Sequence, residues 1–240
     1  MKTLGSALIW TAGGAFFLVV FLIITLGLVC STPERIFPLT RRLAKTLMRI
    51  MGAPVTIKRQ PVPRPGRPYL YMGNHQGMFD LFAIPSALPG HAVGVEAAYH
   101  FSLPVWGYLS RKWGNIPIQR RNLNAAIESI ETARRVLLGG TSIVILPEGH
   151  RTRTGALGEF KKGPFHLALA AGVDIVPFAV LGTFHYHRKG EFHLRPGPVT
   201  VAFGVPVPFS SFRHGTVDQL LHRVRDEILA LAKASHTPID

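Results

Sequence analysis

An uncharged stretch near the start of the chain limits what this sequence can fold into. From Leu4 to Cys30 there is no Asp, Glu, Lys or Arg over 27 positions. As a helix, this stretch would be about 40 Å long at about 1.5 Å per residue, which is enough to cross the hydrocarbon core of a bilayer with some tilt. We therefore expect a membrane helix at residues 4–30, which either spans the bilayer or lies within one leaflet.

The charges that flank this stretch predict its orientation. Lys2 precedes it, and five basic residues follow it: Arg35, Arg41, Arg42, Lys45 and Arg49. Because cytoplasmic flanks are enriched in Lys and Arg, we expect the rest of the chain to face the cytoplasm, at the inner (cytoplasmic) membrane of the cell. A signal peptide would have a shorter apolar core and a small-x-small cleavage site, and a lipoprotein anchor at Cys30 would want a small residue in place of Val29.

Residues 36–51 alternate apolar and basic side chains in the pattern of an amphipathic helix, and Gly52 fits its end. Such a helix could lie at the membrane interface, with its basic residues at lipid phosphates. It could equally pack on the domain that follows, and both alternatives stay open. We divide the chain into a membrane anchor at residues 1–52 and a globular domain at residues 53–240.

The composition narrows the partners of that domain. The formal charge is +14, from 27 basic and 13 acidic residues, which favours an anionic lipid surface, a phosphorylated or acidic substrate, or nucleic acid. No zinc-finger, RNP-type or helix-turn-helix pattern is present, so nucleic acid is not expected. A single cysteine, Cys30, excludes an internal disulfide and a cysteine-cluster metal site. His185, His187 and His193 lack carboxylate partners in the sequence, and we expect no metal ion.

Strand-type and helix-type runs alternate at least three times in residues 53–240, which predicts an α/β fold with a mostly parallel central sheet flanked by helices. The expected strands are at residues 55–58, 69–73, 91–97, 142–146, 174–180, 191–194 and 199–204. Pro177 suggests that its strand lies near a sheet edge or that the proline lies at the strand's end. The aromatic segment 101–113 fits either core packing or the lining of an acyl channel. A last helix is expected from Val217, where Thr216 and Gln219 have capping-box spacing.

A candidate base and its orienting group follow the strand at residues 69–73. The strand ends at Gly73 and opens into His75, and one helical turn would bring the carboxylate of Asp80 back toward the imidazole. A carboxylate on one ring nitrogen fixes the tautomer and leaves the other nitrogen free to take a proton. No activated nucleophile stands beside this pair, so the attacking oxygen would belong to the substrate. A histidine near an aspartate is usually structural, and the pair alone assigns no function.

Further charged residues follow other strands or precede helices. These candidate anion-binding residues are Arg120, Glu148, Gly149, Arg151, Lys161 and Lys162. An arginine at a strand-to-helix junction suits an anion because its fork geometry and the helix dipole act together, although an arginine exposed to solvent is the simpler reading. Gly149 lets the backbone turn tightly, and Glu148 could hold an arginine or accept a hydroxyl.

Four segments together resemble the 1-acylglycerol-3-phosphate O-acyltransferase family of glycerophospholipid acyltransferases. They are the His75–Asp80 block, Gly114 to Arg120, Leu146-Pro-Glu-Gly-His-Arg151, and Ile175-Val-Pro-Phe178, in the family's order and with its gaps. The Phe160-Lys-Lys-Gly-Pro-Phe run also resembles the family. Two positions depart from the pattern: His150 replaces the usual threonine, and Pro117 replaces a bulkier apolar residue.

The resemblance implies an acyltransferase domain at residues 53–240 in which His75 is the general base and Asp80 orients it. The implied reaction moves an acyl group from acyl-CoA or acyl carrier protein, as co-substrate, to the sn-2 hydroxyl of lysophosphatidate and gives phosphatidic acid. It assigns the acceptor phosphate to Arg120, Glu148, Gly149 and Arg151, and we add Lys161 and Lys162 from their charge and position. No cofactor is implied. His150 leaves room for another lysolipid or glycerol 3-phosphate as acceptor, and a membrane-tethered binder of anionic lipids is the non-catalytic alternative.

Overall fold

The computed structural model describes residues 2–59, 67–119 and 123–235. Its helices are α1 (Lys2–Cys30), α2 (Pro33–Ile50), α3 (Asp80–Ala87), α4 (Trp106–Trp113), α5 (Leu123–Leu138), α6 (Gly163–Ala171), α7 (Thr183–Tyr186) and α8 (Val217–Ser235), with short 3-10 turns η1 (Ala98–Ser102) and η2 (Phe209–Ser211). Its strands are β1 (Val55–Arg59), β2 (Leu70–Gly73), β3 (Ala92–Ala97), β4 (Ile116–Ile118), β5 (Ser142–Ile145), β6 (Ile175–Leu181) and β7 (Val199–Phe203).

Within the described residues the strands form one seven-stranded sheet in the order β1-β7-β6-β2-β5-β3-β4. From β6 to β4 all neighbours are parallel, whereas β7 is antiparallel to β6 and parallel to β1. Because parallel neighbours must be joined by crossovers, helices follow most of these strands and cover both faces of the sheet. The predicted α/β fold with a mostly parallel sheet is confirmed.

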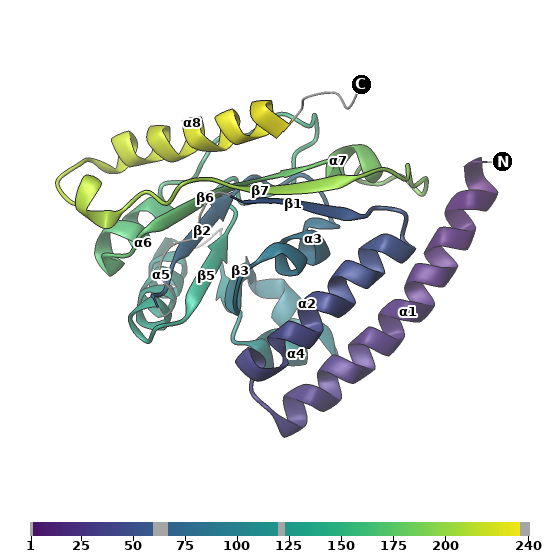
Figure 1. Cartoon of the computed structure of the whole chain (residues 1–240). Coiled ribbons are helices and arrows are strands. Elements are labelled where there is room, and N and C mark those ends of the chain that lie inside the picture. Colours follow the sequence, from purple (N-terminus) through teal and green to yellow (C-terminus); the bar gives the residue numbers. More distant parts are fainter. Residues whose placement is uncertain (1, 60–66, 120–122, 236–240) are drawn as a thin grey trace.

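The core is divided by the sheet into two layers (Figure 1). Helices α2 and α3 pack with one face of the sheet, and α5, α6 and α8 pack with the other. In β2, Tyr71 belongs to the first layer, while Leu70 and Met72 belong to the second, as the alternation of side chains along a strand requires. Strand β2 is therefore central and buried on both faces, and its carboxyl end is a rigid place from which to present a side chain.

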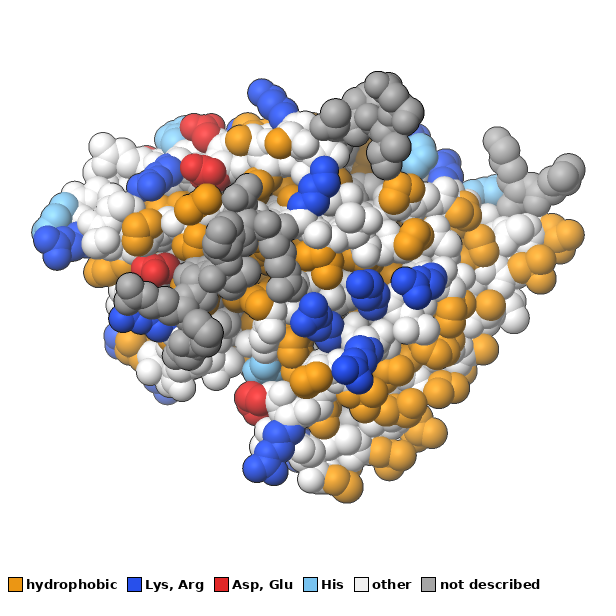
Figure 2. Space-filling model, viewed as in Figure 1, with side chains coloured by type: hydrophobic (Ala, Val, Ile, Leu, Met, Phe, Trp, Pro, Cys, Tyr) orange, Lys and Arg blue, Asp and Glu red, His pale blue; other side chains and the backbone are white. Residues whose placement is uncertain are grey.

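Helix α2 packs on the domain, which is one of the two alternatives that its sequence allowed. Phe37, Leu47 and Met48 are buried in the same core layer as α3. Its opposite side keeps exposed basic residues, and Figure 2 shows basic side chains gathered over this helix. These exposed residues are Arg35, Arg42, Lys45 and Arg49.

Helix α1 lies beside α2 and is long and apolar enough, by length and composition, to cross a membrane. Helix α1 also approaches the residue that follows α2 so closely that a Cβ at Gly13 would lie 1.7 Å from Sδ of Met51. Trp10 packs on Phe79, with ring centroids 5.9 Å apart, and its indole N–H donates to the carbonyl of Phe192 at 2.9 Å. The first helix is therefore fastened to the domain near α3 and not only at its own carboxyl end.

The expected position of the strand that contains Pro177 is wrong. Strand β6 is inside the sheet, between β7 and β2, and Pro177 is its third residue. The proline is tolerated because the regular pairing of β6 with β7 is interrupted at this point. Phe178 pairs with Phe203 of β7, whereas Ile175 pairs with Val207 beyond β7, and the register shifts by one residue between the two pairs. A proline lacks the N–H that a regular ladder would use, and such a break removes the need for it.

The strand expected at residues 191–194 is also absent, since the structure has no strand between β6 and β7. The backbone N–H of Leu194 donates to Oγ of Ser6 in α1, and that of Arg195 donates to the carbonyl of Tyr186. The two backbone N–H groups donate to two different elements, so no regular ladder with a neighbouring strand forms. The aromatic segment 101–113 forms η1 and α4 and is only partly buried; Leu103 is 45% exposed and Tyr108 is 37% exposed.

Candidate active site

His75 and Asp80 meet at the carboxyl end of β2. His75 lies two residues beyond the strand, and Asp80 is the first residue of α3. His75 Nδ1 is 2.7 Å from Asp80 Oδ2, and the side chains are 25% and 1% exposed. The aspartate is sealed in the protein, whereas the imidazole can be reached from outside, as a base that acts on a substrate must be.

The Asp80 carboxylate is surrounded by hydrogen-bond donors. Besides the imidazole, Oδ2 accepts the backbone N–H groups of Gln76 at 2.7 Å and Gly77 at 3.0 Å, and Oδ1 accepts the hydroxyl of Thr183 at 2.5 Å. Donors on every side suit an ionised carboxylate, which only accepts. With Asp80 ionised, Nδ1 of His75 carries the ring proton and the lone pair is on Nε2.

The backbone that precedes His75 is clamped to β6. The Asn74 side chain donates to the carbonyl of Val180 at 2.8 Å and accepts the N–H of Val180 at 2.7 Å, so it continues the sheet pairing beyond Gly73. A Cβ at Gly73 would lie 2.3 Å from the ring of Phe178, so only glycine fits at the end of β2. These two residues fix where the histidine leaves the sheet.

Glu148, in the loop after β5, supports the same backbone from the other side. The residue is 1% exposed, and its Oε1 and Oε2 accept the N–H groups of His75 at 2.7 Å and Gly158 at 2.8 Å. The carbonyl of His75 accepts the N–H of Thr152 at 2.9 Å. Glu148 is thus a buried brace for His75, with each of its two oxygens bonded to a backbone N–H.

The predicted anion-binding residues are distributed unequally. Gly149 has φ +73°, the left-handed conformation that favours glycine, and a Cβ there would lie 4.0 Å from Cγ of Lys161. Arg151 is half-buried and directly precedes Thr152, which is bonded to His75. Gly149 therefore lies close to Lys161, and Arg151 adjoins a residue that is bonded to the His75 backbone. Lys162 instead points to α8, where its Nζ is 2.8 Å from Oδ1 of Asp218. Arg120 lies outside the described residues.

Two contributors to the site were not predicted from the sequence. Thr183 follows the end of β6 and donates to Asp80, and Gly158 supplies an N–H to Glu148. The signal for Thr183 was its place just beyond a buried strand, because the carboxyl ends of parallel strands share one edge of the sheet. Nothing in the sequence singles out Gly158. In the described residues no group of three or more His, Cys, Asp and Glu is arranged to hold a metal ion.

Comparison with known proteins identifies the family of this chain. The Acyltransferase family matches residues 54–181, slightly more than half of the chain. The chain therefore belongs to the acyltransferase family, and the resemblance seen in its four sequence blocks is confirmed.

Relatives within that family are more specific. The 1-acyl-sn-glycerol-3-phosphate acyltransferases of Cocos nucifera and Limnanthes douglasii are 33% and 34% identical to this chain over 75% and 80% of its length. The matches span 58% and 66% of those two relatives. The crystal structure of the 1-acyl-sn-glycerophosphate acyltransferase PlsC from Thermotoga maritima superimposes with a TM-score of 0.86 over 100% of both chains, at 17% identity. This last likeness is one of fold.

Proposed function

We propose that this protein transfers an acyl group from a thioester donor to the sn-2 hydroxyl of 1-acylglycerol 3-phosphate and so makes phosphatidic acid. The observation that carries the proposal is the 2.7 Å contact between a reachable imidazole and a buried carboxylate at the end of β2. Nε2 of His75 removes the hydroxyl proton, and the oxygen attacks the thioester carbonyl. The proton then leaves with the thiol, and no acyl-enzyme forms. A positioned base of this kind contributes about 10² to 10⁴ in rate.

The loop after β5 has two tasks in this proposal. Glu148 holds the His75 backbone, and Arg151 and Lys161 attract the acceptor phosphate to the side of the imidazole. The left-handed turn at Gly149 lets the loop pass close to Lys161. Arg120 keeps the phosphate-binding role that the family resemblance gives it. Lys162 is better suited to tether the loop to α8, through its ion pair with Asp218.

We further propose that α1 lies within one membrane leaflet. Its outward side carries exposed apolar residues: Leu4, Leu8, Leu18, Val19, Leu22, Ile23, Leu26 and Val29. The orange band along one flank in Figure 2 is this surface. Because the helix contacts the domain from Ser6 to Phe17, it cannot cross the bilayer without drawing polar surface into the hydrocarbon. The exposed basic residues of α2 then meet lipid phosphates, and the charge bias of the flanks favours the cytoplasmic leaflet of the inner membrane.

A second acceptor remains a candidate because of His150. This exposed residue occupies the position where the family usually has threonine, in the loop that carries Arg151. An imidazole there would contact a different headgroup, such as that of another lysolipid or glycerol 3-phosphate. The chemistry at His75 would be unchanged.

The test is acyl transfer by the purified full-length protein in mixed micelles. Lysophosphatidate, other lysophospholipids and glycerol 3-phosphate are offered with acyl-CoA or acyl carrier protein, and the position of the new ester is mapped. We expect transfer to the sn-2 position of lysophosphatidate, lost by at least about 10²-fold in His75→Ala. The matched control is His214→Ala, an exposed histidine before α8. Full activity in His75→Ala would refute the assignment of His75 as the general base. A wild-type protein that is inactive on every acceptor would instead favour the non-catalytic binder of anionic lipids.

A further inference from the structure

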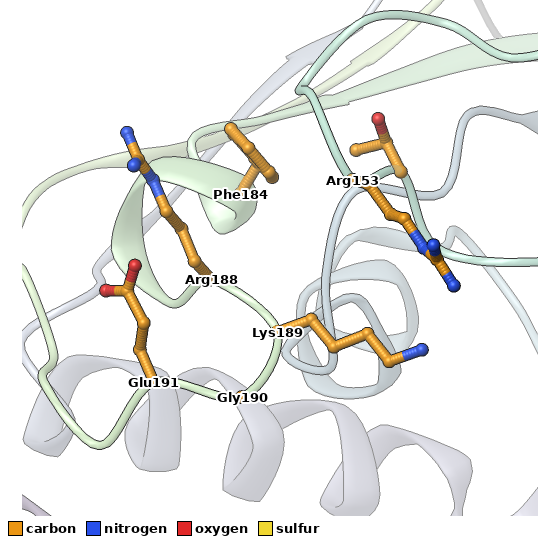
Figure 3. A pocket seen from close by; sticks show the side chains of 7 residues that line it. Arg153, Phe184, Arg188, Lys189, Gly190 and Glu191 are labelled. Atoms are coloured by element: carbon orange, nitrogen blue, oxygen red, sulfur yellow. The ribbon is translucent and has the colours of Figure 1, made fainter.

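A basic pocket lies beside the His75–Asp80 pair and outside the four sequence blocks. Its volume is about 510 Å³, and it is lined by Thr152, Arg153, Phe184, Arg188, Lys189, Gly190 and Glu191. Figure 3 shows that its cations come from two segments far apart in the sequence. Arg153 belongs to the loop after β5, and Arg188 and Lys189 belong to the loop after α7.

The walls of this pocket are continuous with the supports of the dyad. Thr152 lines the pocket and donates its N–H to the carbonyl of His75 at 2.9 Å. Phe184 lines it too, and the preceding residue, Thr183, donates its hydroxyl to Asp80. The loop after β5 also touches α7, since a Cβ at Gly155 would lie 2.9 Å from the Phe184 ring. Two of the segments that line this pocket therefore also hold the backbone of His75 and the carboxylate of Asp80.

The positive charge of the pocket is only partly offset, because the Glu191 carboxylate interacts with Arg188 as well as with Arg195. Arg153, Arg188 and Lys189 are exposed, and in the described part of the chain none of them has an ion-pair partner. The one carboxylate of the lining, Glu191, is held by Arg195 at 2.5 Å, and this hydrogen bond is the main reason that the pKa of Glu191 is lowered. The Arg188 guanidinium lies over the Phe184 ring, 5.6 Å from its centroid, which fixes the direction of the charge.

We propose that this pocket binds the phosphate groups of a coenzyme A thioester, the acyl donor, an inference that rests on the proposed function. In the acceptor, one carbon and one oxygen separate the phosphorus from the carbon that bears the reacting hydroxyl. The acceptor phosphate must therefore lie next to the imidazole, beside Arg151 and Lys161. In coenzyme A the long pantetheine arm separates the thioester from the phosphates, so their binding site must lie farther from the base.

The shape of the site favours coenzyme A over acyl carrier protein. Pockets for small molecules have volumes of about 300 to 1,000 Å³, and this concavity falls within that range. Its lining supplies two guanidinium groups and one ammonium group, which are charge-assisted donors to phosphate. In Figure 3 the heads of Arg153 and Lys189 lie on one side of the pocket and that of Arg188 lies on the other. An acidic protein would instead need a broad basic face, of standard interface size, around the same opening.

The experiment compares the full-length protein with its Arg188→Ala/Lys189→Ala double variant. We expect the KM for acyl-CoA to rise about tenfold, the loss typical of a charge-assisted contact, with kcat and the KM for lysophosphatidate within about twofold. Arg213→Ala is the matched control, because Arg213 is exposed beyond the pocket and its loss also lowers the net charge. In the wild type, adenosine 3′,5′-bisphosphate should inhibit competitively against acyl-CoA, and the double variant should need a higher concentration of it.

Three outcomes overturn the donor pocket: an unchanged KM for acyl-CoA, a rise in the KM for lysophosphatidate instead, or a defect confined to acyl carrier protein as donor. A measurement of coenzyme A binding, which needs no acyl transfer, tests this inference separately from the proposed function. If the wild type transferred no acyl group, calorimetric titration with coenzyme A would still decide. Binding that weakens in the double variant but not in Arg213→Ala supports the pocket, and equal or absent binding in all three proteins refutes it.

Discussion

Glu148 accepts the backbone N–H of His75 at 2.7 Å, and this contact joins the loop after β5 to the end of β2. The glutamate is buried, and its second oxygen accepts the N–H of Gly158. Two segments that are 73 residues apart are thereby held in one arrangement. The position of the imidazole depends on this brace as well as on Asp80.

Replacing Glu148 with Gln should lower kcat without changing acceptor affinity. The amide NH2 cannot accept from a backbone N–H, so one buried N–H is left unpaired, at a cost of about 1–3 kcal/mol in the free energy of unfolding. We expect kcat to fall by about tenfold or more, with the KM for lysophosphatidate within about twofold. Glu159→Gln, an exposed change in the same loop, should behave as wild type. A raised acceptor KM at unchanged kcat would show that Glu148 touches the acceptor after all.

Thr183→Val tests the donor on the far oxygen of Asp80. Valine keeps the shape of the fully buried side chain but cannot donate to Oδ1, so the carboxylate loses one of its supports. Stability should fall by about 1 kcal/mol, and kcat should fall with it because Asp80 is free to turn away from His75. Thr183→Ser restores the hydroxyl and should recover most of kcat, measured at saturating substrate. A loss of kcat in Thr183→Ser with none in Thr183→Val would mean that the methyl group, and not the hydrogen bond, matters.

Gly73→Ala should disrupt the end of β2. The new Cβ would lie 2.3 Å from the Phe178 ring, and overpacking of this kind costs about 1–3 kcal/mol. A second change, Phe178→Leu, makes room and should return part of the loss, as read from denaturant unfolding of the single and double variants. Gly90→Ala is the control, because nothing lies within 4 Å of a Cβ there. If the two changes simply add, the clash is not the cause.

His91 should make the protein less stable in acid. Its side chain is 7% exposed, between the rings of Phe37 and Trp113, and desolvation lowers its pKa, partly offset by the charge of Glu34 at 3.3 Å. The unfolded chain, with a histidine pKa of about 6.5, therefore binds the proton first as the pH falls. Neutral His91 therefore contributes to the free energy of unfolding above that pH, and this contribution is lost as the pH falls below it.

The expected result is a free energy of unfolding that declines between about pH 7 and pH 5, with a smaller decline in His91→Gln. His214→Gln, at an exposed position, should keep the wild-type slope. Only the slope is diagnostic, because the substitution also alters packing on α2. Identical slopes in wild type and His91→Gln would assign the acid sensitivity to other groups.

The local pattern of the chain was enough to predict most elements, because each carries its own signal. The uncharged run became α1, the alternating run became α2, and the capping-box pair forms both of its bonds, from Thr216 N–H to Gln219 at 2.9 Å and from Gln219 N–H to Thr216 at 3.2 Å. The errors at Pro177 and at residues 191–194 have another origin. In both places the partner of the backbone is a distant segment, the bulge after β7 or helix α1, and no local pattern announces it.

The sequence alone determined the fold class and the apolar first helix, because both follow from local patterns of apolar and charged residues. The pairing of His75 with Asp80 was expected from a helical turn, but the residues between them form a loop before α3, in which the N–H groups of Gln76 and Gly77 hold the carboxylate. The tertiary structure decided what each charged residue is available for. It buried Glu148 under His75, turned Lys162 to Asp218 and brought Arg153 together with Arg188 and Lys189. The reason is physical: whether a charge binds a ligand or holds the protein together depends on its solvent access and its partners, and these come from segments that meet only when the sheet forms.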